Sequence, residues 1–168
     1  NYPYDISSQI FFKMLEYKDL IPCCTGMIQR EVAQRIAAGP GSKTYGILSV
    51  LIQAWYNVEY LFTVDEDVFN PPPKVKSAVI RMTRNDVTNI GCDQILFKRV
   101  VKTVFNQRRK MLRVSLRQIF NVTKPTDGFY EQDIMTKRPE QLSIAQFVDL
   151  TNMVEEQLKI IGQKANIS

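Results

Sequence analysis

Asn1, Tyr2, Pro3 and Tyr4 bring together groups that can hold a nucleobase. The Asn1 side chain offers a carbonyl acceptor, and a residue before proline is held extended, which aims the Tyr2 carbonyl outward. Two such acceptors would receive the hydrogens of an exocyclic amino group, such as adenine N6, while the base stacks on Tyr4. Electron density would then stay on the nitrogen during attack on a methyl donor.

This chemistry needs a base that has left its stack, so the target is a flipped or single-stranded nucleotide. The alternative is that residues 1–4 form only a turn before a helix, which an isolated four-residue match would favour. The sequence contains no His, which excludes a His-based triad, a zincin and a His general base. The acceptor scheme needs none of these, and it needs no metal.

A second candidate site is basic. Between positions 98 and 117 there are eight basic residues and no acidic one. They are Lys98, Arg99, Lys102, Arg108, Arg109, Lys110, Arg113 and Arg117. The chain has a net charge of +5, yet the residues outside this segment carry 14 basic and 17 acidic side chains. The whole positive excess therefore falls on one predicted helix pair, which suits RNA phosphates. The alternative is a solvated helix face.

The elements that position these residues follow an α/β pattern over the first 83 residues. We predict a helix that begins after Ser7 or Ser8, a buried strand at 23–28, a helix at 29–38 and a buried helix at 47–56. Strands at 58–64 and 76–83 flank three successive prolines, which force an extended loop. These two strands should pair in antiparallel fashion.

A polar connector at 84–93 marks the predicted domain boundary, so the domains run from 1 to 84 and from 85 to 168. Apolar stripes at 97–105 and 112–120 predict helices in the second domain. A last helix over 144–158 should be capped by Ser143.

Cys23, Cys24 and Cys92 are an odd number of cysteines without C-x-x-C spacing. This favours a reducing, cytoplasmic compartment. No apolar run approaches the roughly 20 residues that span a bilayer. We expect neither a membrane association nor a metal site.

Three strings, in order, resemble one family: "NYPYDISS", "FNPPPKVKSAVIRM" and "FNQRRKMLRVSL". With the intervening "MIQREVAQRIAAGPGSKTYGILSVLIQ", they resemble the ribosomal RNA adenine N6-dimethyltransferases of the KsgA type, from Asn1 to about Val154. The resemblance implies a Rossmann-like class I methyltransferase domain and a small all-α C-terminal domain. It also implies use of S-adenosylmethionine to dimethylate two adjacent adenines near the 3′ end of small-subunit (16S) rRNA, in ribosome biogenesis.

The resemblance also implies roles for residues. Asn1 and the Tyr2 carbonyl would receive the adenine N6 hydrogens, with Asn1 also beside the methyl donor, while Pro3 holds Tyr2 extended. Tyr4 would stack on the adenine, and Phe69 would approach its other side; the alternative for Phe69 is a loop anchor buried in the core. Arg108, Arg109, Lys110 and Arg113 match the basic helix of the C-terminal domain. Tyr2 stands where the family often has Leu, and Asp5 where it often has Asn.

The resemblance places most of the cofactor site in three earlier βα units, with a glycine-rich turn after the first strand. The sequence has no such turn. The glycine-containing string "GPGS" at 39–42 does not qualify, because it follows a predicted helix and not a strand. We therefore expect the C-terminal part of a family member, inactive alone, whose open sheet can self-associate. Two alternatives remain: a macrolide-resistance methyltransferase acting on large-subunit rRNA, and a non-catalytic RNA-binding assembly factor of the same fold.

Overall fold

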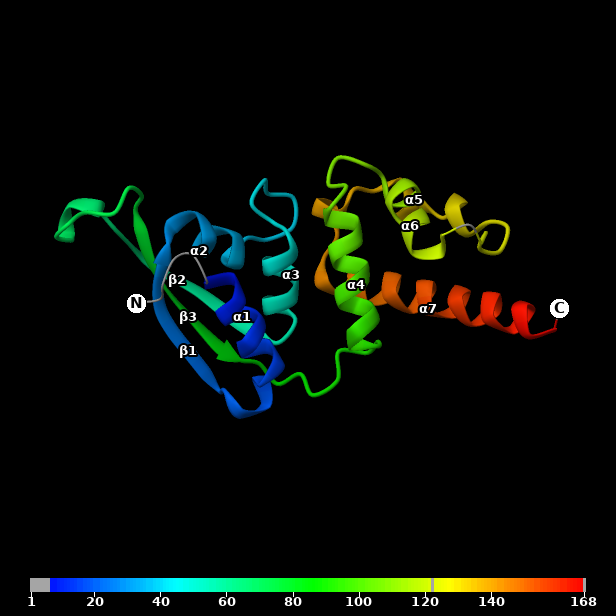
Figure 1. Ribbon diagram of the computed structural model, residues 1–168, viewed down its shortest axis with the longest axis horizontal. Helices are drawn as coiled ribbons and strands as arrows, with labels where there is room; N and C mark the ends of the chain where they lie inside the picture. Colours follow the sequence, from blue (N-terminus) through cyan, green and yellow to red (C-terminus); the bar gives the residue numbers. More distant parts are fainter. Residues whose placement is uncertain (1–6, 122, 168) are drawn as a thin grey trace. The chain divides into compact units, whose positions relative to one another are not determined.

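The computed structural model describes residues 7–121 and 123–167 (Figure 1). They divide into two compact units, Asn1–Thr88 and Asn89–Ser168. The break falls within the polar connector at 84–93, four residues beyond the boundary expected from the sequence. Each unit has its own buried apolar side chains, so each is described separately.

The first unit follows the expected order of elements (Figure 1). They are α1 (Ser7–Glu16), η2 (Lys18–Leu20), β1 (Cys23–Gln29), α2 (Arg30–Ala37), α3 (Ile47–Gln53), β2 (Tyr56–Val64), η3 (Glu66–Val68) and β3 (Ser77–Arg84). The three strands form one sheet in the order β1-β3-β2. Both outer strands pair antiparallel with β3, so the antiparallel pair expected for β2 and β3 is confirmed.

The register places Gln29 opposite Ser77 on one side of β3 and Val64 opposite Ser77 on the other. Between Tyr60 and Phe62 the register of β2 shifts, which marks a β-bulge. Helices α2 and α3 pack against the sheet (Figure 1). Their buried side chains meet those of the strands in the core: Ile28, Ala33, Ile36, Val50, Ile52, Ile80 and Met82.

Two expectations for this unit were wrong in detail. The strand at 23–28 is only half buried, because side chains alternate across a sheet and Cys23 and Thr25 are exposed. The helix expected at 47–56 ends at Gln53. Tyr56 instead starts β2, and its buried hydroxyl donates to the Ile21 carbonyl at 2.8 Å. A short apolar run is compatible with either a helix or a strand, and tertiary packing determines which of the two forms.

The second unit is helical, as the sequence predicts. It contains α4 (Gln94–Phe105), α5 (Leu112–Ser115), α6 (Arg117–Phe120), three 3-10 helices and α7 (Ile144–Ile167). The 3-10 helices are η4 (Phe129–Glu131), η5 (Asp133–Thr136) and η6 (Pro139–Gln141). The predicted cap of α7 is confirmed: Ser143 Oγ accepts from the Gln146 backbone N–H at 3.2 Å, and Gln146 Oε1 accepts from the Ser143 N–H at 2.9 Å.

The helix expected at 112–120 is divided at Leu116 into α5 and α6. The apolar stripe is nevertheless buried, with Leu112, Leu116, Ile119 and Phe120 in the core. No helix in the described part of the chain is long and apolar enough to cross a membrane. The described residues likewise contain no cluster of His, Cys, Asp and Glu suited to a metal ion.

Candidate functional site

The four residues of the Asn-x-Pro-Tyr string lie outside the described residues. The structure therefore gives no geometry for Asn1, Tyr2, Pro3 or Tyr4, and their roles stay predictions. The other candidates, Phe69 and the eight basic residues, lie within the described part of the chain.

Phe69 belongs to the Pro-rich loop, defined here as residues 65–76, which joins β2 to β3. Because β1 and β2 both run antiparallel to β3, their carboxyl ends lie at the edge of the sheet where β3 begins. The Pro-rich loop projects from this edge in Figure 1. In open α/β sheets, ligands bind beyond the carboxyl ends of the strands. The loop is thus placed at the edge where the fold predicts a site.

An ion pair and a backbone hydrogen bond hold the ends of the Pro-rich loop. Lys76 Nζ lies 3.0 Å from Asp65 Oδ1, which joins the last residue of the loop to the first. The backbone N–H of Arg30, at the start of α2, donates to the Lys76 carbonyl at 2.9 Å. The loop is therefore attached to the start of α2 as well as to the strands that it connects.

Phe69 directly follows η3, and its N–H donates to the Glu66 carbonyl at 3.3 Å. Its side chain is half buried and does not belong to the buried core, while the neighbouring Val68 side chain is 71% exposed. The alternative of an anchor fully buried in the core is therefore not observed. Stacking of Phe69 on a base remains a prediction.

A small cavity of about 230 Å³ opens beside the loop end. Its lining comes from the end of β1, the start of α2 and the last loop residues: Gln29, Arg30, Glu31, Gln34, Val75 and Lys76. Pockets for drug-sized ligands run from about 300 to 1,000 Å³. This cavity alone is therefore too small for a ligand of that size.

The basic residues do not all lie on a helix pair, and this corrects the sequence interpretation. Lys98, Arg99 and Lys102 lie on α4, Arg113 on α5 and Arg117 on α6. Arg108, Arg109 and Lys110 occupy the turn between α4 and α5, not a basic helix. The chain turns here because the N–H groups of Gln107 and Lys110 donate to Val104 and Gln107 carbonyls at 3.1 and 2.9 Å.

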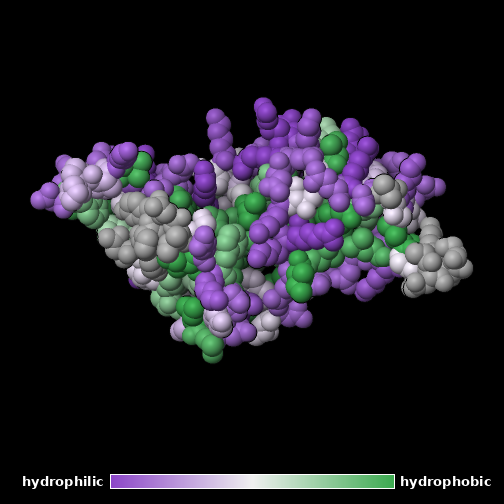
Figure 2. Space-filling model, viewed as in Figure 1, coloured by the Kyte–Doolittle hydropathy of each residue, from purple (hydrophilic) through white to green (hydrophobic). Residues whose placement is uncertain are grey.

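Six of these side chains are exposed, and only Lys102 and Arg108 are half buried. Hydrophilic side chains gather over α4, α5 and their connecting turn in Figure 2. Arg108 is held by Glu140, with Nη2 and Oε2 3.3 Å apart, and its guanidinium carbon lies 5.8 Å from the centre of the Phe105 ring. Folding thus supplies an acidic partner that the segment itself lacks. Arg109 and Lys110 are the exposed cations of the turn.

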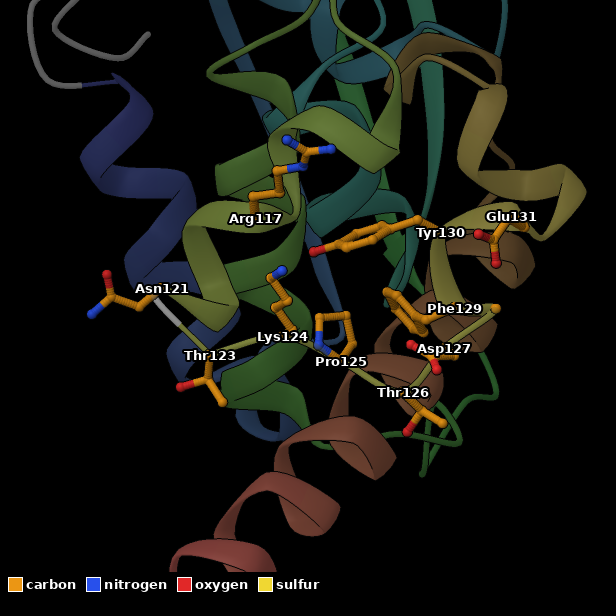
Figure 3. Close-up of a pocket in the computed structure, with 11 residues that line it drawn as sticks. Arg117, Asn121, Thr123, Lys124, Pro125, Thr126, Asp127, Phe129, Tyr130 and Glu131 are labelled. Carbon is orange, nitrogen blue, oxygen red and sulfur yellow. The ribbon is translucent and has the colours of Figure 1, made fainter.

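Arg117 leads to a second cavity that the sequence interpretation missed (Figure 3). This cavity of about 590 Å³ is bordered by α6, the loop at 121–128 and η4. Lys124 and Tyr130 line it together with Arg117, whose guanidinium carbon lies 5.6 Å from the centre of the Tyr130 ring. Burial raises the pKa of Tyr130, with Arg117 acting in the opposite direction. The aromatic pair Phe129–Tyr130, which follows a loop that contains Lys124, was the available sequence signal.

Comparison with known proteins identifies the family. The model of the family "Ribosomal RNA adenine dimethylase" matches residues 1–156. "Ribosomal RNA small subunit methyltransferase A" of Bacteroides thetaiotaomicron is 70% identical over 166 residues, which is 99% of this chain and 61% of the relative. The protein of the same name from Porphyromonas gingivalis is 57% identical over 158 residues, 93% of this chain and 59% of the relative.

Solved structures show the same fold. A dimethyladenosine transferase from Plasmodium falciparum superposes with a TM-score of 0.79 at 23% identity, over 94% of this chain and 66% of that one. The 23S rRNA methyltransferase ErmE gives a TM-score of 0.56 at 22% identity, over 92% of this chain and 63% of that one. These neighbours have the Rossmann-like methyltransferase fold.

The chain spans about three fifths of the length of the curated relatives that it matches. Within that span the family match covers the Asn-x-Pro-Tyr string, the Pro-rich loop and all eight basic residues. By this match and by its identity to the curated relatives, the chain belongs to the ribosomal RNA adenine dimethylase family.

Proposed function

We propose that this chain is part of a methyltransferase that dimethylates two adjacent adenines at N6, near the 3′ end of small-subunit rRNA, in ribosome biogenesis. The observation that carries the proposal is the family match over residues 1–156, which includes both candidate sites. Curated relatives at 57% to 71% identity bear the name of a small-subunit methyltransferase, which favours that RNA over large-subunit rRNA.

In this proposal the target adenine is held by the first four residues. The Asn1 side-chain carbonyl and the Tyr2 backbone carbonyl accept the two N6 hydrogens, and Pro3 keeps Tyr2 extended. Tyr4 stacks on the base, and Phe69 closes the pocket from the Pro-rich loop. Retention of Asn1, Pro3 and Tyr4 disfavours the alternative of a non-catalytic assembly factor.

The methyl donor of this family is S-adenosylmethionine, which supplies an electrophilic methyl group when bound. The resemblance places most of the site for this donor in earlier βα units, around a glycine-rich turn that this sequence lacks. Asn1, the one residue here assigned to the donor, lies outside the described residues. The 168 residues alone are therefore proposed to be inactive.

The two units have separate roles in this proposal. Residues 1–84 belong to the methyltransferase domain with its adenine pocket, and residues 85–168 form a helical RNA-binding domain. The exposed cations from Lys98 to Arg117 contact the phosphates of the small ribosomal subunit, the partner of the enzyme. A cytoplasmic location fits this partner and the three free cysteines.

Self-association is a further part of the proposal. Among the described strands, β1 and β2 are the outer ones in the order β1-β3-β2, and outer strands are where a second chain can add to a sheet. Light scattering of the 168 residues should then show a mass that rises with concentration. A constant mass of one chain would remove this part and leave the enzymatic proposal unaffected.

The enzymatic proposal is tested with the full-length parent protein on small subunits that lack the modification. Mass spectrometry of the rRNA should find dimethyladenine with the parent and none with Asn1→Ala. Asn57→Ala, on the exposed side of β2, is the matched control and should keep full activity. Equal activity of Asn1→Ala and the parent would disprove the acceptor role of Asn1.

A further inference from the structure

The cavity between α6, the loop at 121–128 and η4 has no role in the adenine chemistry described above. Its volume of about 590 Å³ lies within the usual range for ligand pockets. It brings together a tyrosine ring, two cations and two carboxylates: Tyr130, Arg117, Lys124, Asp127 and Glu131. In Figure 3 the Tyr130 hydroxyl and the Lys124 ammonium point toward one another across this space.

The Tyr130 wall of the cavity is held in place by aromatic packing. The ring of Phe129 meets Phe120 edge-on, with centroids 5.4 Å apart, and meets Tyr130 in the same way at 5.2 Å. Phe129 is itself buried, so it fixes η4 on the core of the unit. The Tyr130 ring therefore keeps its position without a ligand, which lowers the entropy lost on binding.

The loop wall is held by α7. The Thr126 N–H and hydroxyl both donate to Gln157 Oε1 at 2.9 Å. Gly128 follows with φ 87°, a left-handed conformation that turns the chain into η4 and that glycine adopts without strain. Lys124 thus extends from a loop that is fastened at its far end.

Arg117 connects the cavity to the basic surface. Its Nε donates to the Arg113 carbonyl at 3.1 Å, which directs the guanidinium over Tyr130. Arg113 is exposed one turn earlier, and Arg109 and Lys110 lie in the preceding turn. An RNA strand that follows these cations would arrive at the cavity.

We propose that the cavity at Arg117, Lys124 and Tyr130 binds one unpaired nucleotide of the RNA. The base lies against Tyr130 and Arg117, since single-stranded bases stack on aromatic rings and guanidinium planes. Lys124 contacts the phosphate. Asp127 and Glu131 repel a free anion but accept hydrogen bonds from an exocyclic amino group, so the site prefers adenine, cytosine or guanine to uracil. This inference rests on the RNA-binding role proposed above.

The test compares two RNA hairpins that differ only by one bulged adenosine. The 168-residue chain should bind the bulged hairpin more tightly than the fully paired one. Tyr130→Leu should lose this preference, with a drop of roughly 5- to 150-fold for the bulged hairpin, the range for loss of one stacked base. Tyr130→Phe keeps the ring and should retain the preference, while Tyr17→Leu, at an exposed tyrosine of the first unit, should change nothing.

A second measurement uses the unaltered chain, because Tyr130→Leu could weaken the fold. A hairpin with bulged 5-iodocytidine is irradiated, and the crosslinked peptide is identified by mass spectrometry. A crosslink within residues 117–131 supports the site, whereas crosslinks confined to other residues overturn it.

The outcomes separate this inference from the proposed function. If Arg109→Gln with Lys110→Gln weakens both hairpins while Tyr130→Leu keeps the bulge preference, the nucleotide site is wrong and the RNA interface stands. If the unaltered chain binds neither hairpin at low salt, both are wrong.

Discussion

Lys76 Nζ lies 3.0 Å from Asp65 Oδ1, so the two ends of the Pro-rich loop are joined by one ion pair. Both side chains are at least two fifths exposed, which limits the contribution of the pair to global stability to about 1 kcal/mol or less. Its effect is local, because it joins the two ends of the loop just beyond Val64 and Ser77, the last paired residues of β2 and β3.

Asp65→Asn should therefore loosen the loop without unfolding the unit. We expect faster amide hydrogen exchange and faster proteolysis within 65–76, with a melting temperature close to that of the parent chain. Asp67→Asn, within η3 and outside the ion pair, is the control. Equal exchange in the two variants would show that the pair does not hold the loop.

Alkaline pH should destabilise the first unit through Tyr45. Burial raises the pKa of Tyr45 from 10.0 to about 12. The folded state then binds the phenol proton more tightly than the unfolded state, so this stabilisation is complete below pH 10 and is lost as the pH rises toward 12. One proton corresponds to a slope of about 1.4 kcal/mol per pH unit in that window.

Urea denaturation between pH 9 and 12 measures this slope. Tyr45→Phe should reduce it, and Tyr17→Phe, at an exposed ring, should leave it as in the parent. Tyr56 also has a pKa raised by burial, so a part of the slope should persist. An unchanged slope in Tyr45→Phe would contradict the prediction.

Alkylation should distinguish the cysteines. Burial raises the pKa of Cys92 to about 11, and a hydrogen bond with Thr151 only partly offsets this. Since the thiolate is the reactive form, Cys92 should react slowly with iodoacetamide at pH 8, whereas the exposed Cys23 should react quickly. Mass spectrometry of the two peptides over time gives both rates, and comparable rates would show that Cys92 is not protected in solution.

The exposed cations of the α4–α5 turn should set the salt dependence of RNA binding. Each phosphate contact with single-stranded RNA contributes about 0.7 to the slope of log K against log salt. Arg109→Gln with Lys110→Gln should lower that slope by about one to two units across unrelated RNA sequences. Lys159→Gln removes a charge at the far end of α7 and serves as control. A slope that stays as steep in the double variant would locate the phosphate contacts elsewhere.

Calorimetry should show no tight S-adenosylmethionine binding by the 168 residues alone. The reason is the absence of a glycine-rich turn after a strand in this sequence, which the resemblance requires for the cofactor site. The full-length parent is the positive control. Micromolar binding by the 168 residues would disprove the prediction.

The sequence predicted best where the signal is local. Ser143 caps α7 because Gln146 lies three residues on, and this pattern can be read directly. The end of α3 could not be predicted, since 47–56 is apolar apart from Ser49 and Gln53 and gives no stop signal. The helix ends because Tyr56 is buried as the first residue of β2. The 3-10 helices at 129–141 have no periodic signal, and they were missed.

The site shows the same division. Residues 1–4 form one short segment and the cations at 98–117 another, so each set can be recognised in the sequence. The pair Arg108–Glu140 spans 32 residues, and Arg117 reaches Tyr130 only because α6 ends and the chain turns back. Contacts of this kind depend on tertiary packing, which residue spacing does not encode.

The position of β3 has a consequence for how the chain assembles. Among the described strands it is the last in the sequence, yet it lies between β1 and β2. Neither β1 nor β2 can pair with β3 until the ribosome has added the residues up to Arg84. Until then the edges of β1 and β2 that β3 will cover are open, a state exposed to misassembly. An enzyme proposed to act in making ribosomes thus leaves the ribosome with β1 and β2 joined by a strand that is added after both of them.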